Sequence, residues 1–200
     1  MPTPADWEGI YVLSGGSATL DHTVIRYGGD YTEYALVWVD DGGSLTLTNS
    51  LLDHSERYGV VVEGVENPII LNNTIQNCSS YGIYVYDYDS DNLPVSPEIR
   101  GNTINNTNTP IYLNAIDGYT GIEMITNNAG SGNANQVIRL GHTLVGDVKL
   151  GATNGFDWSN ISTLTLTAGA TWEIGPDEVY KVFGQSEIRI LGTLFTSGTT

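Results

Sequence analysis

The stretch from Asp87 to Glu98 holds the residues of this 200-residue chain whose types and spacing best suit chemistry. Counted from Asp87, carboxylates stand at positions 1, 3, 5 and 12, as Asp87, Asp89, Asp91 and Glu98. A hard cation such as Ca²⁺ is held by roughly six to eight oxygen atoms, and alternating carboxylates on a tight turn supply several of them. Leu93, at position 7, would add its backbone carbonyl oxygen. The spacing therefore predicts a calcium site.

This ligand spacing resembles that of an EF-hand calcium loop. Position 6 is Asn92 in place of the usual glycine, which is compatible because asparagine also adopts the left-handed backbone conformation. Pro94 and Pro97 exclude the helix that normally follows such a loop, so the resemblance is confined to the ligands. The alternative is a solvated acidic loop between two strands.

The residues before this loop belong to a strand pattern that recurs along the chain. Its clearest copy is 81–87, and further copies lie at 8–13, 34–39, 58–63 and 109–114. In each copy apolar and mixed residues alternate, which is typical of a strand with one buried face. Measured from positions 9, 35, 59, 82 and 110, the spacings are 26, 24, 23 and 28 residues. A strand that recurs at this period predicts a solenoid.

Alternation along these strands also predicts a column of side chains that point outward. The first large apolar residue of each copy is expected to point inward, so its successor, and the residue two positions further on, point outward. Four of these outward positions carry tyrosines, namely Tyr11, Tyr84, Tyr86 and Tyr112. Because tyrosine rings stack on sugar faces while their hydroxyls form hydrogen bonds, these residues predict a polysaccharide-binding face. The alternative is that part of 116–136, or a neighbouring subunit, covers them.

A second set of segments follows the first strands and also aligns, at 20–25, 47–52, 70–75 and 99–104. In each segment two large apolar residues stand five apart and enclose small polar residues. A regular strand would place residues five apart on opposite faces, so a bend is required for both to point inward. Asn, Ser, Thr and Gly stabilise such bends. Stacking of successive coils then predicts a polar ladder formed by Thr23, Ser50, Asn73 and Asn102.

The same alignment predicts two walls of a hydrophobic core. One wall is a stack of Ile25, Leu52, Ile75 and Ile104. The other wall is formed by Val12, Trp38, Val62, Val85 and Leu113. Trp38 is the unusual member, because a tryptophan strains a coil that is otherwise lined by valines. On the outside, Asp53 falls in the column of Arg26 and is expected to form a surface ion pair with it.

These repeats resemble the right-handed parallel β-helix of the pectate-lyase-like superfamily. The resemblance rests on 75–84 and on 7–10 together with 20–28, and it extends over about residues 7–115. It implies an all-β fold with three short parallel strands per coil and a core of stacked aliphatic side chains. It does not specify the function, because the fold hosts lyases, hydrolases, adhesins and inert fibres.

The pattern changes after the fifth copy. Residues 116–136 are rich in glycine and asparagine and are predicted to form an irregular connection between the coils of 1–115 and further strand coils in 137–200. Segment 163–200 resembles the opening coils of large bacterial surface β-helices, which lead into a coil like the one that begins here at Trp7. The end of the chain thus resembles what should precede its start. Either the chain is cut from a tandem array, or separate subunits stack end to end into filaments.

The composition restricts the partners. With 7 Lys and Arg against 23 Asp and Glu, the formal net charge is −16, which argues against binding to nucleic acid or to an anionic membrane surface. Cys78 is the only cysteine, so the chain contains no internal disulfide. No apolar run reaches the length of a membrane span, and the first residues lack the pattern of a signal peptide.

Catalytic signatures in the sequence are weak. Lyases of the superfamily pair calcium with a basic residue, yet only Arg100 stands near the acidic loop. Hydrolases of the superfamily need converging carboxylates, and Asp40, Asp41 and the pair Gly141-His142 match only parts of that set. We therefore expect a non-catalytic structural or adhesive module, secreted or at the cell surface, stabilised by Ca²⁺ and binding polysaccharide or other copies of itself. The alternative is a polysaccharide lyase or glycoside hydrolase.

Overall fold

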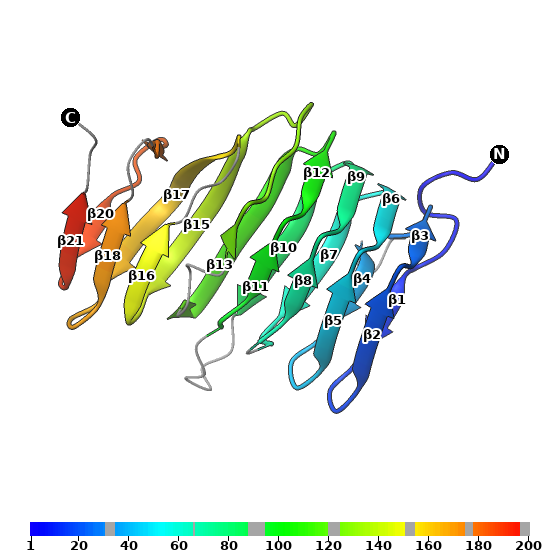
Figure 1. Ribbon diagram of the computed structural model, residues 1–200, viewed down its shortest axis with the longest axis horizontal. Coiled ribbons are helices and arrows are strands. Elements are labelled where there is room, and N and C mark those ends of the chain that lie inside the picture. The colour runs from blue at the N-terminus through cyan, green and yellow to red at the C-terminus, as the bar shows by residue number, and fades with distance from the viewer. Residues whose placement is uncertain are drawn as a thin grey trace.

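The computed structural model describes residues 1–30, 35–65, 67–87, 95–119, 125–150, 155–174 and 178–196. Within these residues every regular element is a β-strand, and every strand pairs with its neighbours in parallel. The strands stack in rows along the long axis, with the first coil at one end and the last coil at the other (Figure 1). The predicted solenoid is confirmed.

The strands form four sheets. Sheet 1 runs the length of the molecule and contains β1 (Ile10–Val12), β4 (Ala35–Val39), β7 (Tyr58–Glu63), β10 (Tyr81–Asp87), β13 (Thr109–Tyr119), β15 (Val137–Leu144), β17 (Asp157–Leu166), β19 (Tyr180–Val182) and β20 (Ile188–Ile190). Sheet 2 contains β2 (Ser17–Asp21), β5 (Ser44–Thr48), β8 (Ile69–Leu71), β11 (Glu98–Arg100) and β14 (Ile125–Thr126). Sheet 3 contains β3 (Val24–Arg26), β6 (Leu51–Ser55), β9 (Thr74–Cys78) and β12 (Thr103–Asn105). Sheet 4 contains β16 (Asp147–Leu150), β18 (Thr171–Ile174) and β21 (Thr193–Thr196).

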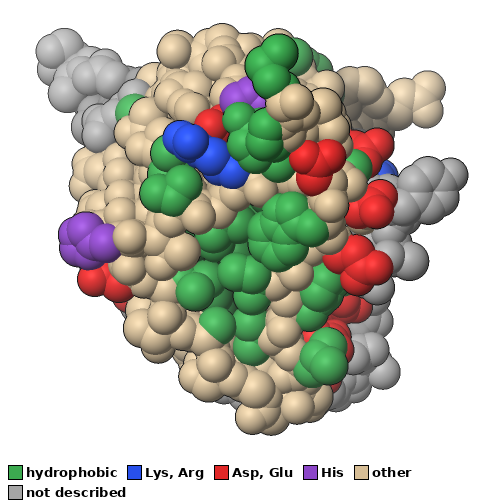
Figure 2. Space-filling view, turned by 90° about the vertical axis from the view of Figure 1, so that its right-hand side faces the viewer, with side chains coloured by type: hydrophobic (Ala, Val, Ile, Leu, Met, Phe, Trp, Pro, Cys, Tyr) green, Lys and Arg blue, Asp and Glu red, His purple; other side chains and the backbone are tan. Residues whose placement is uncertain are grey.

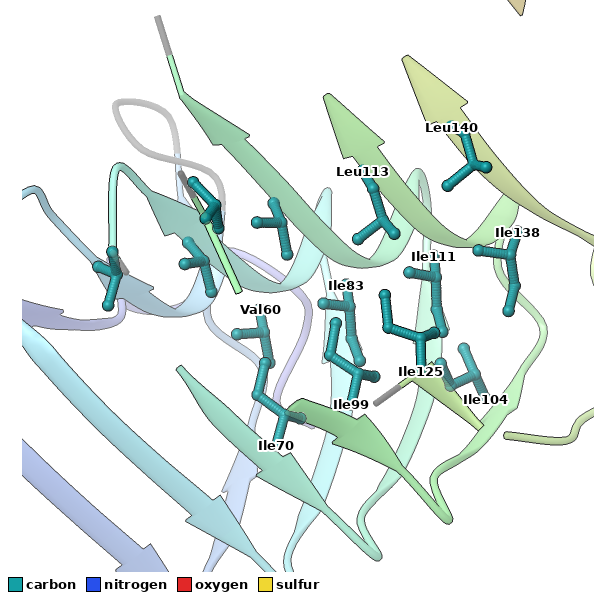
Figure 3. Packing of buried hydrophobic residues seen from close by; sticks show 14 of the residues in the cluster. Val60, Ile70, Ile83, Ile99, Ile104, Ile111, Leu113, Ile125, Ile138 and Leu140 are labelled. Carbon is teal, nitrogen blue, oxygen red and sulfur yellow. The ribbon is translucent and has the colours of Figure 1, made fainter. Parts of the chain in front are cut away.

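The sheets enclose one hydrophobic core that is open to view at the N-terminal end, where apolar side chains gather in the centre of the coil (Figure 2). Inside, side chains of the same type stack in columns from coil to coil (Figure 3). Val60, Ile83, Ile111 and Ile138 are consecutive partners in sheet 1, and none of them is exposed. Each coil thus buries its apolar side chains against the coils on both sides, which a single coil cannot do.

The structure confirms one predicted core wall and corrects the other. Ile25, Leu52, Ile75 and Ile104 are in register and buried, as expected. In the second wall, Val39 and not Trp38 pairs with Val12. Trp38 lies in the outward column of sheet 1 between Tyr11 and Val61. The physical reason is size, because Val37 and Val39 fill the narrow interior while the indole ring packs outside.

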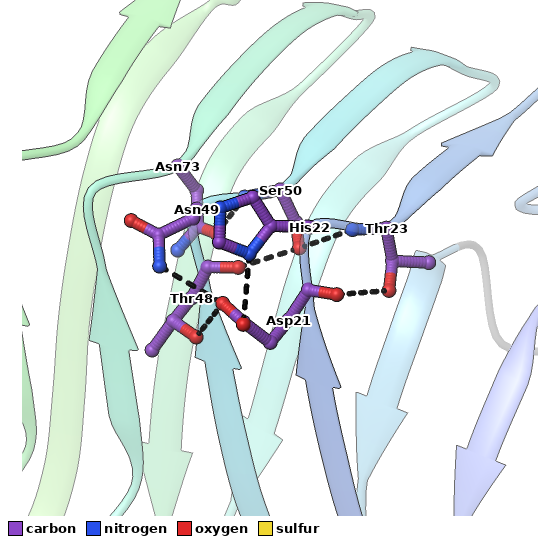
Figure 4. A network of polar contacts seen from close by, with 7 residues as sticks. All are labelled: Asp21, His22, Thr23, Thr48, Asn49, Ser50 and Asn73. Carbon is purple, nitrogen blue, oxygen red and sulfur yellow. Dashed lines mark hydrogen bonds and ion pairs between the residues drawn. The ribbon is translucent and has the colours of Figure 1, made fainter.

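The predicted polar ladder is confirmed and extends one coil further. The backbone N–H of Thr23 donates to Ser50 Oγ, that of Ser50 to Asn73 Oδ1, and that of Asn73 to Asn102 Oδ1, over 2.9–3.0 Å. Figure 4 shows the first part of this chain of contacts. Asn128 adds a further step, since its Oδ1 accepts from the N–H of Asn102 at 3.1 Å. In the last four coils of the ladder the residue at the bend is buried. The ladder gives the buried polar groups there their hydrogen-bond partners.

Left-handed backbone conformations make the bends possible. Immediately before the ladder, one residue per coil has a positive φ angle: His22, Asn49, Asn72, Gly101 and Asn127. A second column with positive φ lies at the C-terminal ends of the strands of sheet 3 and in the coil after them: Tyr27, His54, Asn77, Asn106 and Gly132. Asparagine and glycine adopt this conformation at little cost, which explains why the sequence is rich in both. His22 and His54 occupy such left-handed positions as well.

The segment 116–136, expected to be an irregular connection, differs from that expectation in both of its described parts: 116–119 complete β13, and 125–136 belong to a further coil. Ile125 pairs with Ile99 in sheet 2, and Ala129 bridges to Thr103. Asn133 then forms a second buried ladder with Thr107, whose N–H and hydroxyl both donate to Asn133 Oδ1. The abundant Gly and Asn of this segment serve the two bends of an ordinary coil, so composition alone was misleading here.

Candidate functional site

The predicted calcium ligands lie only partly within the described residues. Asp87 is the last residue of β10 and its exposed fraction is 2%. Glu98 is the first residue of β11, in a different sheet, and forms an ion pair with Arg100. Asp89, Asp91 and Leu93 fall outside the described residues. In the part of the chain that the structure describes, no group of three or more His, Cys, Asp or Glu side chains is placed to hold a metal.

The positions of Asp87 and Glu98 indicate which of the two could be a cation ligand. Asp87 is buried, so its neighbours hold its side chain in place, and it is the residue at which β10 ends and the acidic loop begins. Glu98 is already engaged by a guanidinium, which competes with a role as a metal ligand. The calcium site therefore stays a prediction that rests mainly on the three aspartates.

The outer face of sheet 1 carries a cluster of aromatic side chains. We call it the aromatic cluster, and its members are Trp38, Tyr58, Tyr81, Tyr84, Tyr86 and Tyr112. The rings of Tyr84 and Tyr112 are stacked, with centroids 5.3 Å apart and planes 17° apart. The rings of Tyr58 and Tyr81 are also stacked, at 5.4 Å and 14°. Successive coils thus bring together rings that are far apart in the sequence.

The members of the aromatic cluster differ in exposure. Tyr58 and Tyr86 are buried, with exposed fractions of 9% and 7%. Tyr81, Tyr84 and Tyr112 are half-buried, so parts of their rings reach the surface. Of the four predicted contact tyrosines, Tyr86 is therefore not a surface residue. It packs against Tyr84, with ring centroids 4.8 Å apart, and so helps to hold that ring in place.

Tyr11 shares the outward column but lies at its far end. In the register of sheet 1 it pairs with Trp38, which pairs with Val61, which pairs with Tyr84. Val61 is fully buried and separates the N-terminal members of the column from the stacked tyrosines. Of the predicted residues, Tyr84, Tyr86 and Tyr112 lie together. Tyr11 lies two coils beyond Val61, on the side away from Tyr84.

Sequence reasoning missed three members of the aromatic cluster. Trp38 was placed in the core by the one-residue error in register. Tyr58 and Tyr81 each precede a glycine, and these two Tyr-Gly pairs stand 23 residues apart. A Cβ atom on Gly59 or Gly82 would lie 2.6 or 2.7 Å from a backbone carbonyl oxygen of the next coil, so only glycine fits there. The repeated pair was therefore a usable signal for both tyrosines.

A second constellation surrounds Asp53 on sheet 3. Its carboxylate accepts from Asn77 Nδ2 at 2.8 Å, lies 2.6 Å from His54 Nδ1 and lies 3.3 Å from Arg26 Nε. The predicted pairing of Arg26 with Asp53 is confirmed, although Asp53 is buried and not at the surface. The Tyr27 ring lies 5.2 Å from the His54 ring. We call Asp53 and the three groups at its carboxylate, from Arg26, His54 and Asn77, the Asp53 cluster.

Burial and hydrogen bonding act in opposite directions on Asp53. Burial alone would raise the pKa of its carboxyl group, but hydrogen bonds from Asn77 and Gln76, together with His54, outweigh burial and leave the pKa lowered. The carboxylate is thus ionised, and it lies beside Nδ1 of the half-exposed His54 ring.

A family model described as a right handed beta helix region matches residues 5–145, which is more than half of the chain. The chain belongs to this family. The predicted fold, a right-handed parallel β-helix, is confirmed. No curated protein and no solved structure shows a significant similarity to this β-helix. In the part of the β-helix that the structure describes, no helix is long and apolar enough to cross a membrane.

Proposed function

We propose that this β-helix is a non-catalytic structural and adhesive module, secreted or at a cell surface, that binds polysaccharide through the aromatic cluster. The observation that carries the proposal is the stacked pair Tyr84 and Tyr112, whose half-buried rings lie side by side on two adjacent strands. A sugar presents an apolar face of C–H groups, which packs on an aromatic ring while the tyrosine hydroxyl bonds to sugar hydroxyls. A rigid sheet holds both rings in place before the ligand binds.

The surroundings of the aromatic cluster favour a neutral glycan over an anionic one. The net charge of −16 opposes the approach of polyanions. Two cations stand nearby among the described residues: the Arg57 guanidinium lies 4.8 Å from the centroid of the Tyr58 ring, and Arg139 is the register partner of Tyr112. The buried rings of Tyr58 and Tyr86 fix the half-buried ones from the side, so ligand binding orders few additional groups.

Calcium enters this proposal as a structural ion. Asp87 follows Tyr86 directly in β10 and pairs with Ala115 of β13, next to the strand positions of the stacked tyrosines. A cation held by Asp87 and the following acidic loop would fix the end of β10 and, with it, the edge of the aromatic cluster. It would supply positive charge and geometry to the protein without taking part in any reaction.

Binding to a panel of neutral and acidic polysaccharides tests the proposal. We expect retention of the parent chain on at least one neutral glycan by affinity electrophoresis, and at least a tenfold weaker interaction for Tyr84→Ala and Tyr112→Ala. Tyr84→Phe keeps the ring and should retain most of the affinity. Tyr27→Asn is the matched control, because it removes an aromatic ring from another face at a φ of +62°, which asparagine tolerates. Equal binding by all four variants, or none by the parent, contradicts the proposal.

The Asp53 cluster favours a second candidate, a polysaccharide lyase or glycoside hydrolase. A buried carboxylate that orients a half-exposed imidazole is an arrangement used for general bases, and the half-exposed Arg26 beside it suits an anionic substrate. The same glycan panel separates the two functions. Release of unsaturated or reducing products, abolished by His54→Asn, supports an enzyme, whereas binding without products supports the module.

A further inference from the structure

The exposed large apolar side chains of this β-helix occur only in its terminal coils, among the described residues. At the N-terminal end they are Met1, Trp7, Leu13 and Val24. At the C-terminal end they are Val179, Val182, Phe183, Ile190, Leu191 and Phe195. Isolated apolar residues are normal on any surface, but their confinement to two opposite ends is not. The two ends therefore differ in kind from the sides of the molecule.

The hydrophobic core explains why exposed apolar side chains occur at the two ends. Its partly buried members lie in the first and last coils: Ile10, Ala18, Leu20, Ile174, Tyr180, Ile188 and Leu194. In register they continue the same inward columns, since Ile188 pairs with the buried Leu164 and Leu194 with the buried Trp172. Each terminal residue is half-covered because one of its two neighbouring coils is missing from the described chain. One further coil at either end would bury them.

The backbone of the terminal strands is also only partly paired. Within the described residues, β1, β2 and β3 each pair on one side only, as do β19, β20 and β21. Such edges present N–H and C=O groups that recruit another strand. The two sets belong to opposite ends of one parallel stack, and in sheet 1 translation of a second copy along the axis brings β1 against β19 and β20 in parallel. Every ladder inside the molecule has this same parallel arrangement.

Shape and charge distinguish head-to-tail contact from contact between like ends. The N-terminal end has a hollow of about 450 Å³ lined by residues 10–14 and 16–18, while Leu191 and Phe195 project at the other end with exposed fractions of 71% and 56%. Residues 1–30 contain four acidic side chains and one basic, whereas 178–196 contain two of each. Two N-terminal ends would therefore repel each other, and acidic side chains visible at the margin of that end agree with this (Figure 2).

We propose that a second copy of this chain docks with its N-terminal end on the C-terminal end of the first, so that the hydrophobic core and the strand ladders continue from one molecule into the next. The contact joins two different surfaces and leaves the outer end of each partner free. Such a heterologous contact does not close on itself, and linear growth into a filament is its natural product. The proposal is independent of glycan binding, because it uses the ends of the β-helix and not the outer face of sheet 1.

Two charge substitutions at exposed positions test the docking. Leu13→Lys blocks the N-terminal end and Ile190→Lys blocks the C-terminal end. The parent side chains are 64% and 46% exposed, so both variants should fold with unchanged circular dichroism. Thr103→Lys adds the same charge to an exposed position of a middle coil and is the matched control. Sedimentation velocity over a range of concentrations gives the association state, and negative-stain imaging shows any filaments.

We expect the parent chain and the control to associate with increasing concentration, and each end-blocked variant to stay monomeric. An equimolar mixture of the two blocked variants should form dimers and nothing larger, because only one complementary pair of ends is left. A blocked variant that dimerises alone indicates contact between like ends and overturns the proposal. A parent chain that stays monomeric at every concentration also overturns it and leaves adjoining coils of a longer chain as the cover of these ends.

Discussion

Substitution of Asn102 by alanine is expected to destabilise the β-helix more than the loss of one ordinary hydrogen bond. The Asn102 side chain is fully buried within the polar ladder. Its Oδ1 accepts from the N–H of Asn73 at 2.9 Å, and its Nδ2 donates to the carbonyl oxygen of Ile70 at 2.9 Å. Alanine leaves both of these backbone groups without the partner that the side chain supplied, in a place that water does not reach.

The expected magnitude follows from these two groups. A buried polar group that loses its partner costs about 1–3 kcal/mol, so the two together predict a loss of about 2–6 kcal/mol in the free energy of unfolding. The bond from Asn102 Nδ2 to Asn128 Oδ1, at 2.9 Å, is lost as well. Asn73 Nδ2 keeps its second acceptor, the carbonyl oxygen of Leu47, so it adds little to the loss.

Urea unfolding followed by far-UV circular dichroism measures the change. Asn135→Ala is the control, because that amide bonds to Asn108 in an exposed position where water can replace it, and we expect a change below about 0.5 kcal/mol. Asn102→Asp adds a second check. Burial raises the pKa of the new carboxyl group, so this variant should gain stability as the pH falls from neutrality towards about 4, where the protonated group donates again. If Asn102→Ala behaves like the control, the ladder does not support the fold as argued.

Three further predictions concern the core, the acidic loop and the first bend. Ile75→Ala should lower the free energy of unfolding by about 2–5 kcal/mol, and a loss below about 1 kcal/mol in urea unfolding would mean that the register is wrong. Calcium chelation should lower the unfolding temperature, since an ion bound only to the native state stabilises it, and Asp89→Ala should abolish the effect; identical melting curves with and without chelator argue against the site. Hydrogen bonds, led by that from Asn49, lower the pKa of Asp21 to about 2, so its contribution to stability should be lost as the pH falls from about 4 to about 2. Asp21→Asn should remove that part of the pH dependence in unfolding measurements, and an unaltered pH profile would count against it.

The ladder and the first core wall were predictable because they repeat with local signatures. Residues five apart around a bend, such as Ile70 and Ile75, define their own register within one short segment. The second wall had no such anchor. Aligning the copies on Gly9 and Ala35 sets a spacing of 26, whereas the structure pairs Ile10 with Val37, a spacing of 27. Because side chains alternate along a strand, that single residue moves Trp38 from one face to the other.

The sites were harder to predict than the fold because their members come from different coils. The Asp53 cluster joins residues 26, 53 and 77, whose separations of 27 and 24 match the repeat only when the bends are aligned. His54 reaches Asp53 because its left-handed φ of +60° turns the side chain back, and the alternation of a strand carries no sign of that. The burial of a side chain is equally hard to predict. Tyr84 and Tyr86 look alike in the sequence, yet their neighbours bury only Tyr86.

The outward columns carry the information on function that the inward columns lack. Every coil buries apolar residues inward, and this pattern alone identifies the fold, so recognition of the fold leaves the function open. In sheet 1 the column of Tyr84 and Tyr112 continues in register into Arg139, Ser159 and Lys181. The aromatic surface therefore ends at β13, while the inward column stays apolar through Ile138 and Trp158. A change of character in one outward column, above a core that stays apolar, is what a localised binding surface on a continuous scaffold requires.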